Sequence, residues 1–266
     1  MTSTHSPLTD RTTLRPGQSL LRFAGVALPA GWAFLSVPLF TSWPVEPFVL
    51  ATLFLGMVPV ALLLTRNGQH TTVRSLLRDC VRLPRPLAWL VPAALLIPVA
   101  TRLGASAAGG GEQVTTDLLV GLTVNVVSSI LIVNLWEEMV WAGFVQRTAS
   151  HAYGFVRGAL LTAGLFVAIH LPLAFYGVED VADVGRNLAI MVASGVGMRF
   201  LVGALDLWGR GSILAIALLH ATFNASSDLV DASHDWIRYA VTLAFGLLVL
   251  FAPGLRRSHA WTEELR

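Results

Sequence analysis

Apolar segments long enough to cross a bilayer run through most of this chain. A helical span needs about 20 mostly apolar residues, because the helix rises about 1.5 Å per residue and the hydrocarbon core is about 30 Å thick. The sequence offers about eight such segments, at approximately 19–40, 47–64, 87–103, 118–147, 157–176, 187–208, 211–230 and 237–255. This pattern predicts an all-α fold, a polytopic integral membrane bundle of about eight transmembrane helices.

The composition supports this environment and excludes others. Hydrophobic residues make up 55% of the chain and charged residues only 13%, whereas a soluble domain carries about 25% charged residues. The net charge of +2 does not indicate nucleic-acid binding, because the basic residues fall mainly in loops and near span ends. The lone Cys80 excludes an internal disulfide and a cysteine metal cluster. All 18 basic residues are arginine, which indicates the GC-rich coding typical of many bacteria.

The arginines also orient the bundle, since cytoplasmic loops carry an excess of positive charge. The loops expected in the cytoplasm contain Arg11, Arg15, Arg22, Arg66, Arg74, Arg78, Arg82, Arg85, Arg147, Arg157, Arg210, Arg256 and Arg257. The opposite loops contain Glu46, Glu112, Asp117, Glu179, Asp180, Asp183, Asp228, Asp231 and Asp235. This alternation predicts a multi-pass protein of the plasma membrane, with both termini in the cytoplasm.

The chain is expected to form one domain. Residues 19–255 make up the transmembrane helical domain, in contact with membrane lipids, and no internal repeat is apparent. Residues 1–18 are polar and are expected to form a disordered cytoplasmic tail, and residues 256–266 a second cytoplasmic tail.

Ionisable residues inside the apolar segments mark a candidate site. Glu137 and Glu138 follow the apolar run of the fourth segment, His170 lies in the fifth, and His220 and Asn224 lie in the seventh. Counted from the arginines at the cytoplasmic ends of their helices, the first glutamate and the two histidines all lie roughly 15–20 Å into the membrane. Charged groups at such depth are costly and usually functional. Three helices therefore deliver polar groups to one layer.

These residue types favour water attack on a carbonyl. A carboxylate in a low-dielectric pocket can act as a general base, a neighbouring histidine can orient the water, and a second histidine with an asparagine amide can stabilise an oxyanion. A zinc ion held by Glu137, His170 and His220 is the alternative. The sequence has no HExxH motif, no cysteine ligand, no evident serine triad and no phosphate-binding loop. A site without a metal or other cofactor is therefore favoured.

Three motifs at these residues resemble the CPBP intramembrane peptidase family, which includes the type 2 CAAX prenyl endopeptidases and bacteriocin-processing or self-immunity proteins. EEMVWAGFVQ from Glu137, FVAIH ending at His170, and GSILAIALLHATFN ending at Asn224 match the EExxxR, FxxxH and HxxxN blocks of that family. The resemblance covers roughly residues 118–230. It implies an endopeptidase in which Glu137 is the general base, His170 positions the water, and His220 and Asn224 form the oxyanion hole. Family members have been described both as metallopeptidases and as metal-independent glutamate peptidases.

One position departs from the family pattern, since Ala142 stands where the family usually has arginine. Arg147 is one candidate replacement, but it lies nearly three helical turns from Glu137. Arg199, inside the sixth segment, needs a partner at its own depth. We hypothesise that Arg199 replaces the missing arginine by pairing with Glu138 or Glu137, the alternative being an arginine that snorkels to lipid headgroups. Asp206 and Arg210, four residues apart, are expected to form an interfacial ion pair.

Three functions remain open at this stage. The leading one is an intramembrane endopeptidase that cleaves a membrane-associated protein or peptide. The second is a catalytically silent family member that acts in bacteriocin tolerance or as a membrane scaffold, which Ala142 favours. The third is a proton-coupled transporter with Glu137, His170 and His220 as its relay.

Overall fold

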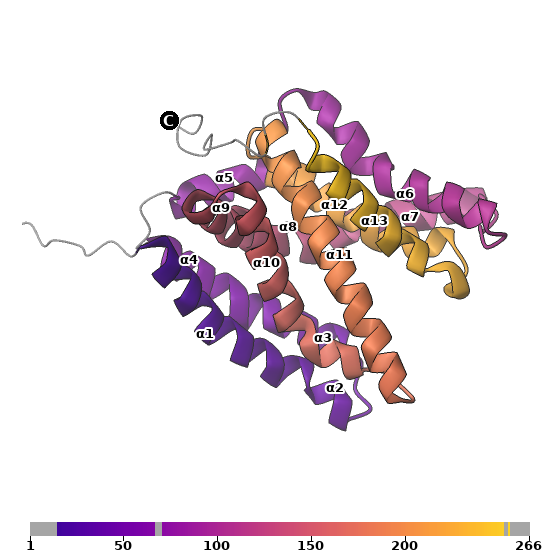
Figure 1. The fold of residues 1–266 in the computed structure, drawn as a ribbon, viewed down its shortest axis with the longest axis horizontal. Helices are drawn as coiled ribbons and strands as arrows, with labels where there is room; N and C mark the ends of the chain where they lie inside the picture. Colours follow the sequence, from indigo (N-terminus) through magenta and orange to yellow (C-terminus); the bar gives the residue numbers. More distant parts are fainter. Residues whose placement is uncertain (1–14, 67–70, 253–254, 256–266) are drawn as a thin grey trace, which may run out of the picture.

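The computed structural model describes residues 15–66, 71–252 and 255, and this part of the chain is helical throughout apart from turns and one isolated β-bridge between Gly111 and Val230. Figure 1 shows the helices as one bundle. The α-helices are α1 Pro16–Leu35, α2 Val37–Phe40, α3 Glu46–Ala51, α4 Val58–Arg66, α5 Val73–Val81, α6 Leu90–Ala107, α7 Thr116–Ser129, α8 Leu135–Glu138, α9 Arg147–Tyr153, α10 Phe155–His170, α11 Val181–Trp208, α12 Ile213–Ala225 and α13 Trp236–Val249. Short π-helical and 3₁₀ turns join several of them into longer rods.

In the described part of the chain, 6 helical rods are long and apolar enough to cross a membrane. They are Pro16–Phe40, Glu46–Arg66, Leu87–Ala107, Thr116–Tyr153, Phe155–Phe175 and Val181–Trp208. The all-helical, membrane-spanning class is therefore confirmed. The seventh predicted span corresponds to a shorter apolar helix, Ile213–Leu229, and the eighth to α13, which has 14 residues.

The predicted tails fall largely outside the described residues. The N-terminal tail was expected to end at residue 18, but α1 already begins at Pro16. Proline favours this position because its fixed φ suits the first helical turn, where its missing N–H costs nothing. Residues 1–14 and the C-terminal tail, 256–266, lie outside the described part.

Large apolar side chains cover the outside of the bundle. Leu21 on α1, Leu103 on α6 and Val124 on α7 are each more than half exposed. Contiguous apolar surface of this kind is rare on a soluble monomer. With the long apolar helices, it points to a multi-pass membrane protein.

The centre of the bundle is organised around α11, which Figure 1 shows with α10 on one side and α12 and α13 on the other. Glycines allow α11 and α13 to cross at close range. A Cβ on Gly197 would lie 2.5 Å from the Thr242 carbonyl oxygen, and one on Gly246 would lie 2.6 Å from the Gly197 Cα. Because no side chain separates the backbones there, the two helices are in close contact at this point.

Candidate functional site

Two π-helical turns frame the paired glutamates. Within the rod Thr116–Tyr153, the four residues of α8 lie between π-helical turns at Ile130–Asn134 and Met139–Gln146. Such turns are rare and occur frequently at functional sites. Glu137 and Glu138 end α8 and both turn toward the interior of the bundle. The Glu138 side chain is 0% exposed, whereas that of Glu137 is 13% exposed.

Glu138 forms a buried, bidentate ion pair with Arg199 of α11. Arg199 Nη1 donates to Glu138 Oε2 at 2.9 Å and Nη2 donates to Oε1 at 2.5 Å, and both side chains are 0% exposed. His220 of α12 adds a third contact, with Nδ1 2.7 Å from Glu138 Oε1. Since an ionised carboxylate only accepts, His220 donates its Nδ1–H. Glu138 therefore joins α8, α11 and α12.

Glu137 lies beside two histidines and forms no direct hydrogen bond with either of them. His170 Nε2 lies 3.8 Å from Glu137 Oε1, and His220 Nδ1 lies 3.9 Å from Glu137 Oε2. Both distances exceed a direct hydrogen bond and leave room for a water at the side. His170 Nδ1 lies 2.8 Å from the Phe166 carbonyl oxygen, an obligate acceptor, so that nitrogen carries the proton. The Nε2 of a neutral His170 consequently presents a lone pair toward Glu137.

The ring of Phe166, on α10, forms an aromatic wall between these groups. Its centroid lies 4.5 Å from the His170 ring and 5.4 Å from the Trp141 ring, and the Arg199 guanidinium stands 5.3 Å above it. The ring excludes water from the Glu138–Arg199 pair and adds a cation–π contact. It also restricts the orientation of His170, whose backbone-anchored ring has little freedom left.

A cavity of about 800 Å³ reaches this cluster. His170 and Asn224 both line it, together with parts of α10, α11, α12 and α13. Asn224 lies one helical turn beyond His220, as the HxxxN spacing requires. Within the described residues, its side-chain amide forms no hydrogen bond, although its backbone oxygen accepts one from Ser227 at 3.0 Å. The amide is therefore free to bind a ligand in the cavity.

The structure thus brings Glu137, Glu138, His170, Arg199 and His220 into one cluster and places Asn224 at its open side. Of the two partners considered for Arg199, the structure has Glu138. The catalytic roles themselves stay predictions.

Ala142 lies away from solvent in a tightly packed layer. It is 1% exposed and belongs to a buried apolar cluster that contains Met198 and Val202, which flank Arg199 on α11. Helix α11, which carries Arg199, therefore packs close to Ala142.

The zinc alternative would use Glu137, His170 and His220. Among the described residues, no group of three or more His, Cys, Asp or Glu side chains is arranged to hold a metal ion. The physical reason lies at His220, whose nitrogen nearest Glu137 already donates to Glu138 at 2.7 Å. A metal at that nitrogen would require the proton to leave and the hydrogen bond to break. As arranged, His220 Nδ1 is therefore not available as a zinc ligand.

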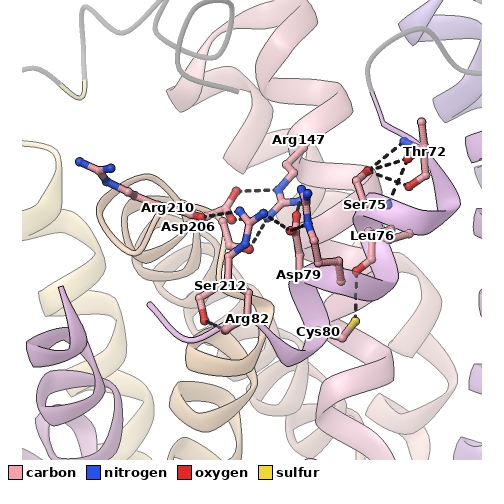
Figure 2. Close-up of polar contacts among 12 residues, drawn as sticks. Thr72, Ser75, Leu76, Asp79, Cys80, Arg82, Arg147, Asp206, Arg210 and Ser212 are labelled. Carbon is pink, nitrogen blue, oxygen red and sulfur yellow. Dashed lines mark hydrogen bonds and ion pairs between the residues drawn. The ribbon is translucent and has the colours of Figure 1, made fainter. Parts of the chain in front are cut away.

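A second buried ionic cluster lies at the arginine-rich end of the bundle (Figure 2). Arg147 donates to Asp206 through Nε at 3.0 Å and Nη2 at 2.7 Å, and to Asp79 through Nη1 at 2.7 Å. Arg82 also pairs with Asp79 at 3.1 Å and donates to the Arg210 carbonyl oxygen at 2.9 Å. The cluster ties α5, α9 and α11 together.

This cluster corrects two expectations from the sequence. Asp206 does not pair with Arg210; both of its oxygens accept from Arg147, and the Arg210 side chain points away from it in Figure 2. Arg147 does not replace the arginine missing at Ala142, because it is committed to Asp206 and Asp79. An i, i+4 spacing considers one helix only, and here the stronger partner comes from another helix. Asp79, on the amphipathic α5, was missed as a functional or structural residue.

These observations define a multi-pass membrane protein with a buried carboxylate–histidine cluster, next to a cavity that His170 and Asn224 line. Residues 119–226 match the family model of type II CAAX prenyl endopeptidases, Rce1-like. The match spans every residue of the candidate site and confirms the resemblance to the CAAX protease family. No curated protein matches the chain.

Proposed function

We propose that this protein is an intramembrane endopeptidase that hydrolyses a peptide bond of a membrane-associated protein or peptide. The observation that carries the proposal is the contrast between the two glutamates. Glu138 is fully buried and neutralised by Arg199, whereas Glu137 is partly exposed and lies 3.8 Å from His170 Nε2. Glu138 holds the helices of the site together, and Glu137 is available to react.

In the proposed mechanism, a water lies within reach of Glu137 and His170. It donates one hydrogen to the Glu137 carboxylate and one to His170 Nε2, so that its oxygen lone pair faces the cavity. Glu137 accepts a proton as the oxygen attacks the scissile carbonyl, and no covalent enzyme intermediate forms. The proton then passes from Glu137 to the leaving amine.

The developing oxyanion is stabilised by His220 and Asn224. The Asn224 amide is free in the cavity and can donate directly. His220 gives its Nδ1–H to Glu138, so its Nε2 can donate only when the ring is the doubly protonated imidazolium. The negative charges of Glu137 and Glu138 balance the positive charges of Arg199 and a protonated His220. This mechanism therefore requires an ionised Glu137 together with a protonated His220, which gives a bell-shaped dependence of kcat/KM on pH.

The proposal includes the topology. Helix α12 with the turn after it, Ile213–Leu229, has a length of roughly 25 Å, and α13 of roughly 21 Å, enough to cross a locally thinned bilayer. They would be the seventh and eighth spans of a plasma-membrane protein with both termini in the cytoplasm.

The test compares wild type with Glu137→Gln, each reconstituted with membrane proteins extracted from the host, and maps new peptide termini by mass spectrometry. Glu112→Gln, an exposed glutamate on the loop before α7, is the matched control. Termini that appear with wild type and Glu112→Gln but not with Glu137→Gln are expected. Identical maps for all three folded proteins would contradict the proposal and favour the catalytically silent alternative.

A further inference from the structure

Asn224, one of the two residues assigned to the oxyanion hole, lies at the end of its helix. It is the second-to-last residue of α12, Ile213–Ala225. Helix ends fray, whereas a donor stabilises an oxyanion only if it is already in place when the charge develops. The direction of the Asn224 side chain therefore depends on what fixes the end of α12.

Arg238 of α13 contacts this end of α12 at two consecutive residues. Its Nη1 donates to the Asn224 carbonyl oxygen at 3.5 Å, and its guanidinium lies 5.2 Å above the ring of Phe223. The Asn224 carbonyl is among the last four of the helix, which have no partner inside it. A cation at this position also interacts favourably with the helix dipole. Arg238 therefore fixes the end of α12 from a neighbouring helix.

Arg238 is itself held in one orientation. Asp235, just before α13, contacts it with both oxygens, Oδ1 at 2.6 Å from Nε and Oδ2 at 3.0 Å from Nη2. Nη2 also donates to the Tyr239 hydroxyl at 2.5 Å, and the guanidinium is stacked 4.4 Å above the Tyr239 ring. Bidentate pairing and stacking fix the plane of a guanidinium. With its side chain only 14% exposed, Arg238 is a rigid support.

The same contacts extend toward the second proposed donor. The Phe223 ring beneath Arg238 also lies 6.3 Å from the His220 ring. Arg238 and Asn224 both line the cavity, but the charge of Arg238 is compensated by Asp235. These contacts favour a role in holding the neighbouring side chains over a direct role in the chemistry.

We propose that Arg238 is a positioning residue of the peptidase site, which holds the end of α12 so that the Asn224 amide points at the developing oxyanion. This inference rests on the peptidase function proposed above. Arg238 acts through Asn224. It belongs to none of the three motifs of the resembling family, and it lies outside the matched residues 119–226.

The test is a double-mutant cycle between Arg238→Met and Asn224→Ala. Each protein is reconstituted in liposomes, and kcat and KM are measured with a quenched fluorescent peptide that carries the cleavage sequence mapped for wild type. Arg238→Met is expected to lower kcat by about 10–100-fold, since a small displacement of a catalytic group can cost this much. KM should change little, because the oxyanion forms only in the transition state.

The cycle separates a positioning role from a general loss of structure. Asn224→Ala alone should lower kcat by about 100–1000-fold, as the loss of an oxyanion donor does. In that background, Arg238→Met should cost less than about threefold more, because the amide through which it acts is already absent. An equal loss in both backgrounds would overturn the proposal.

Arg238→Lys separates position from charge. Lysine keeps the positive charge but lacks the planar fork that pairs and stacks, so its kcat is expected to be as low as that of Arg238→Met. A wild-type kcat in Arg238→Lys would refute the positioning role. Arg157→Met, at an exposed arginine of α10, is the matched control and should keep the wild-type kcat.

Asp235→Asn is a milder variant that keeps the proposal testable if Arg238→Met does not fold. It preserves the size of the side chain and removes the charge that anchors the guanidinium. It should also lower kcat, and less so when Asn224 is alanine. An unchanged kcat in folded Asp235→Asn would count against the proposal.

The two proposals fail in different ways. If Glu137-dependent cleavage occurs but the losses at Arg238 and Asn224 add, the peptidase function stands and the positioning role is wrong. If wild type cleaves nothing, the peptidase function is wrong, and the role of Arg238 with it.

Discussion

Replacing Arg199 by methionine removes the guanidinium that pairs with both oxygens of Glu138. The two hydrogen bonds, of 2.9 and 2.5 Å, lie between side chains that are 0% exposed, so water cannot compensate for the lost charge. Removal of one partner from a buried pair costs about 3–5 kcal/mol. At about 2–4 °C per kcal/mol for a chain of this size, the apparent Tm is expected to fall by roughly 10 °C.

The assay is thermal unfolding in detergent, followed by tryptophan fluorescence at a fixed scan rate. Arg186→Met is the control, since it removes an arginine from the same helix whose side chain is 66% exposed and whose pair is local; a change below about 1 kcal/mol is expected. The double variant Arg199→Met with Glu138→Gln should recover most of the loss, because glutamine is uncharged and still accepts from His220. A Tm for Arg199→Met within the range of Arg186→Met would refute the reasoning and favour an arginine that is solvated by headgroups.

A second comparison tests whether Arg199 stands in for the arginine missing at Ala142. The variant Arg199→Ala with Ala142→Arg returns a guanidinium to the same layer from the neighbouring helix. We expect it to regain peptide cleavage that Arg199→Ala lacks, and to be more stable than either single variant. Absence of rescue in a folded double variant would show that the position of the charge, and not only its presence, is required.

Three further outcomes follow from the packing and charge of particular residues. Asp206→Asn is expected to lower the apparent Tm by several degrees, because Arg147 loses a bidentate charged partner, whereas Arg210→Gln should leave it unchanged; equal effects would contradict the cluster. Gly246→Leu forces a side chain into the α13–α11 crossing and should reduce folded protein in size-exclusion chromatography, while the same change at exposed Gly25 should not. Burial, with a smaller contribution from Asp79, raises the pKa of the Cys80 thiol to about 11 from an ordinary value of 9.0. The unfolded chain therefore releases this proton first as the pH rises, and the free energy of unfolding should fall by about 2–3 kcal/mol between pH 9 and 11. The sequence contains no lysine that would titrate in this range. In a pH series of Tm values, Cys80→Ala should therefore remove most of that fall.

The sequence was sufficient to predict that Arg199 pairs with one of the two adjacent glutamates, because a buried charge without a partner is costly. A buried guanidinium needs a carboxylate at its own depth, and few carboxylates were available inside the apolar segments. The choice between Glu137 and Glu138 could not be made from an ideal helix, since adjacent residues point about 100° apart. The π-helical turns on both sides of α8 shift that register, and they have no clear signal in the residue pattern.

The expectation for Asp206 failed for the opposite reason. Local spacing offered Arg210 as a partner, and local spacing alone cannot reveal Arg147, 59 residues away in the chain. Asp79 lies among arginines that served as a topology signal, and nothing in the residue pattern marks it as buried. Its burial at 4% exposure is a tertiary property, which depends on how α5 lies against α9 and α11.

The two ends of the bundle differ in how they can deform. At the arginine-rich end, Arg147 bridges segments that are distant in the chain, so α5, α9 and α11 must move together. At the other end, the ion pairs of α11 and α13, Arg186–Asp183 and Arg238–Asp235, are internal to their own segments and resist no separation. The arginine-rich end is therefore the more rigid of the two. At the other end, the distance between α11 and α13 can change without breaking either of these ion pairs.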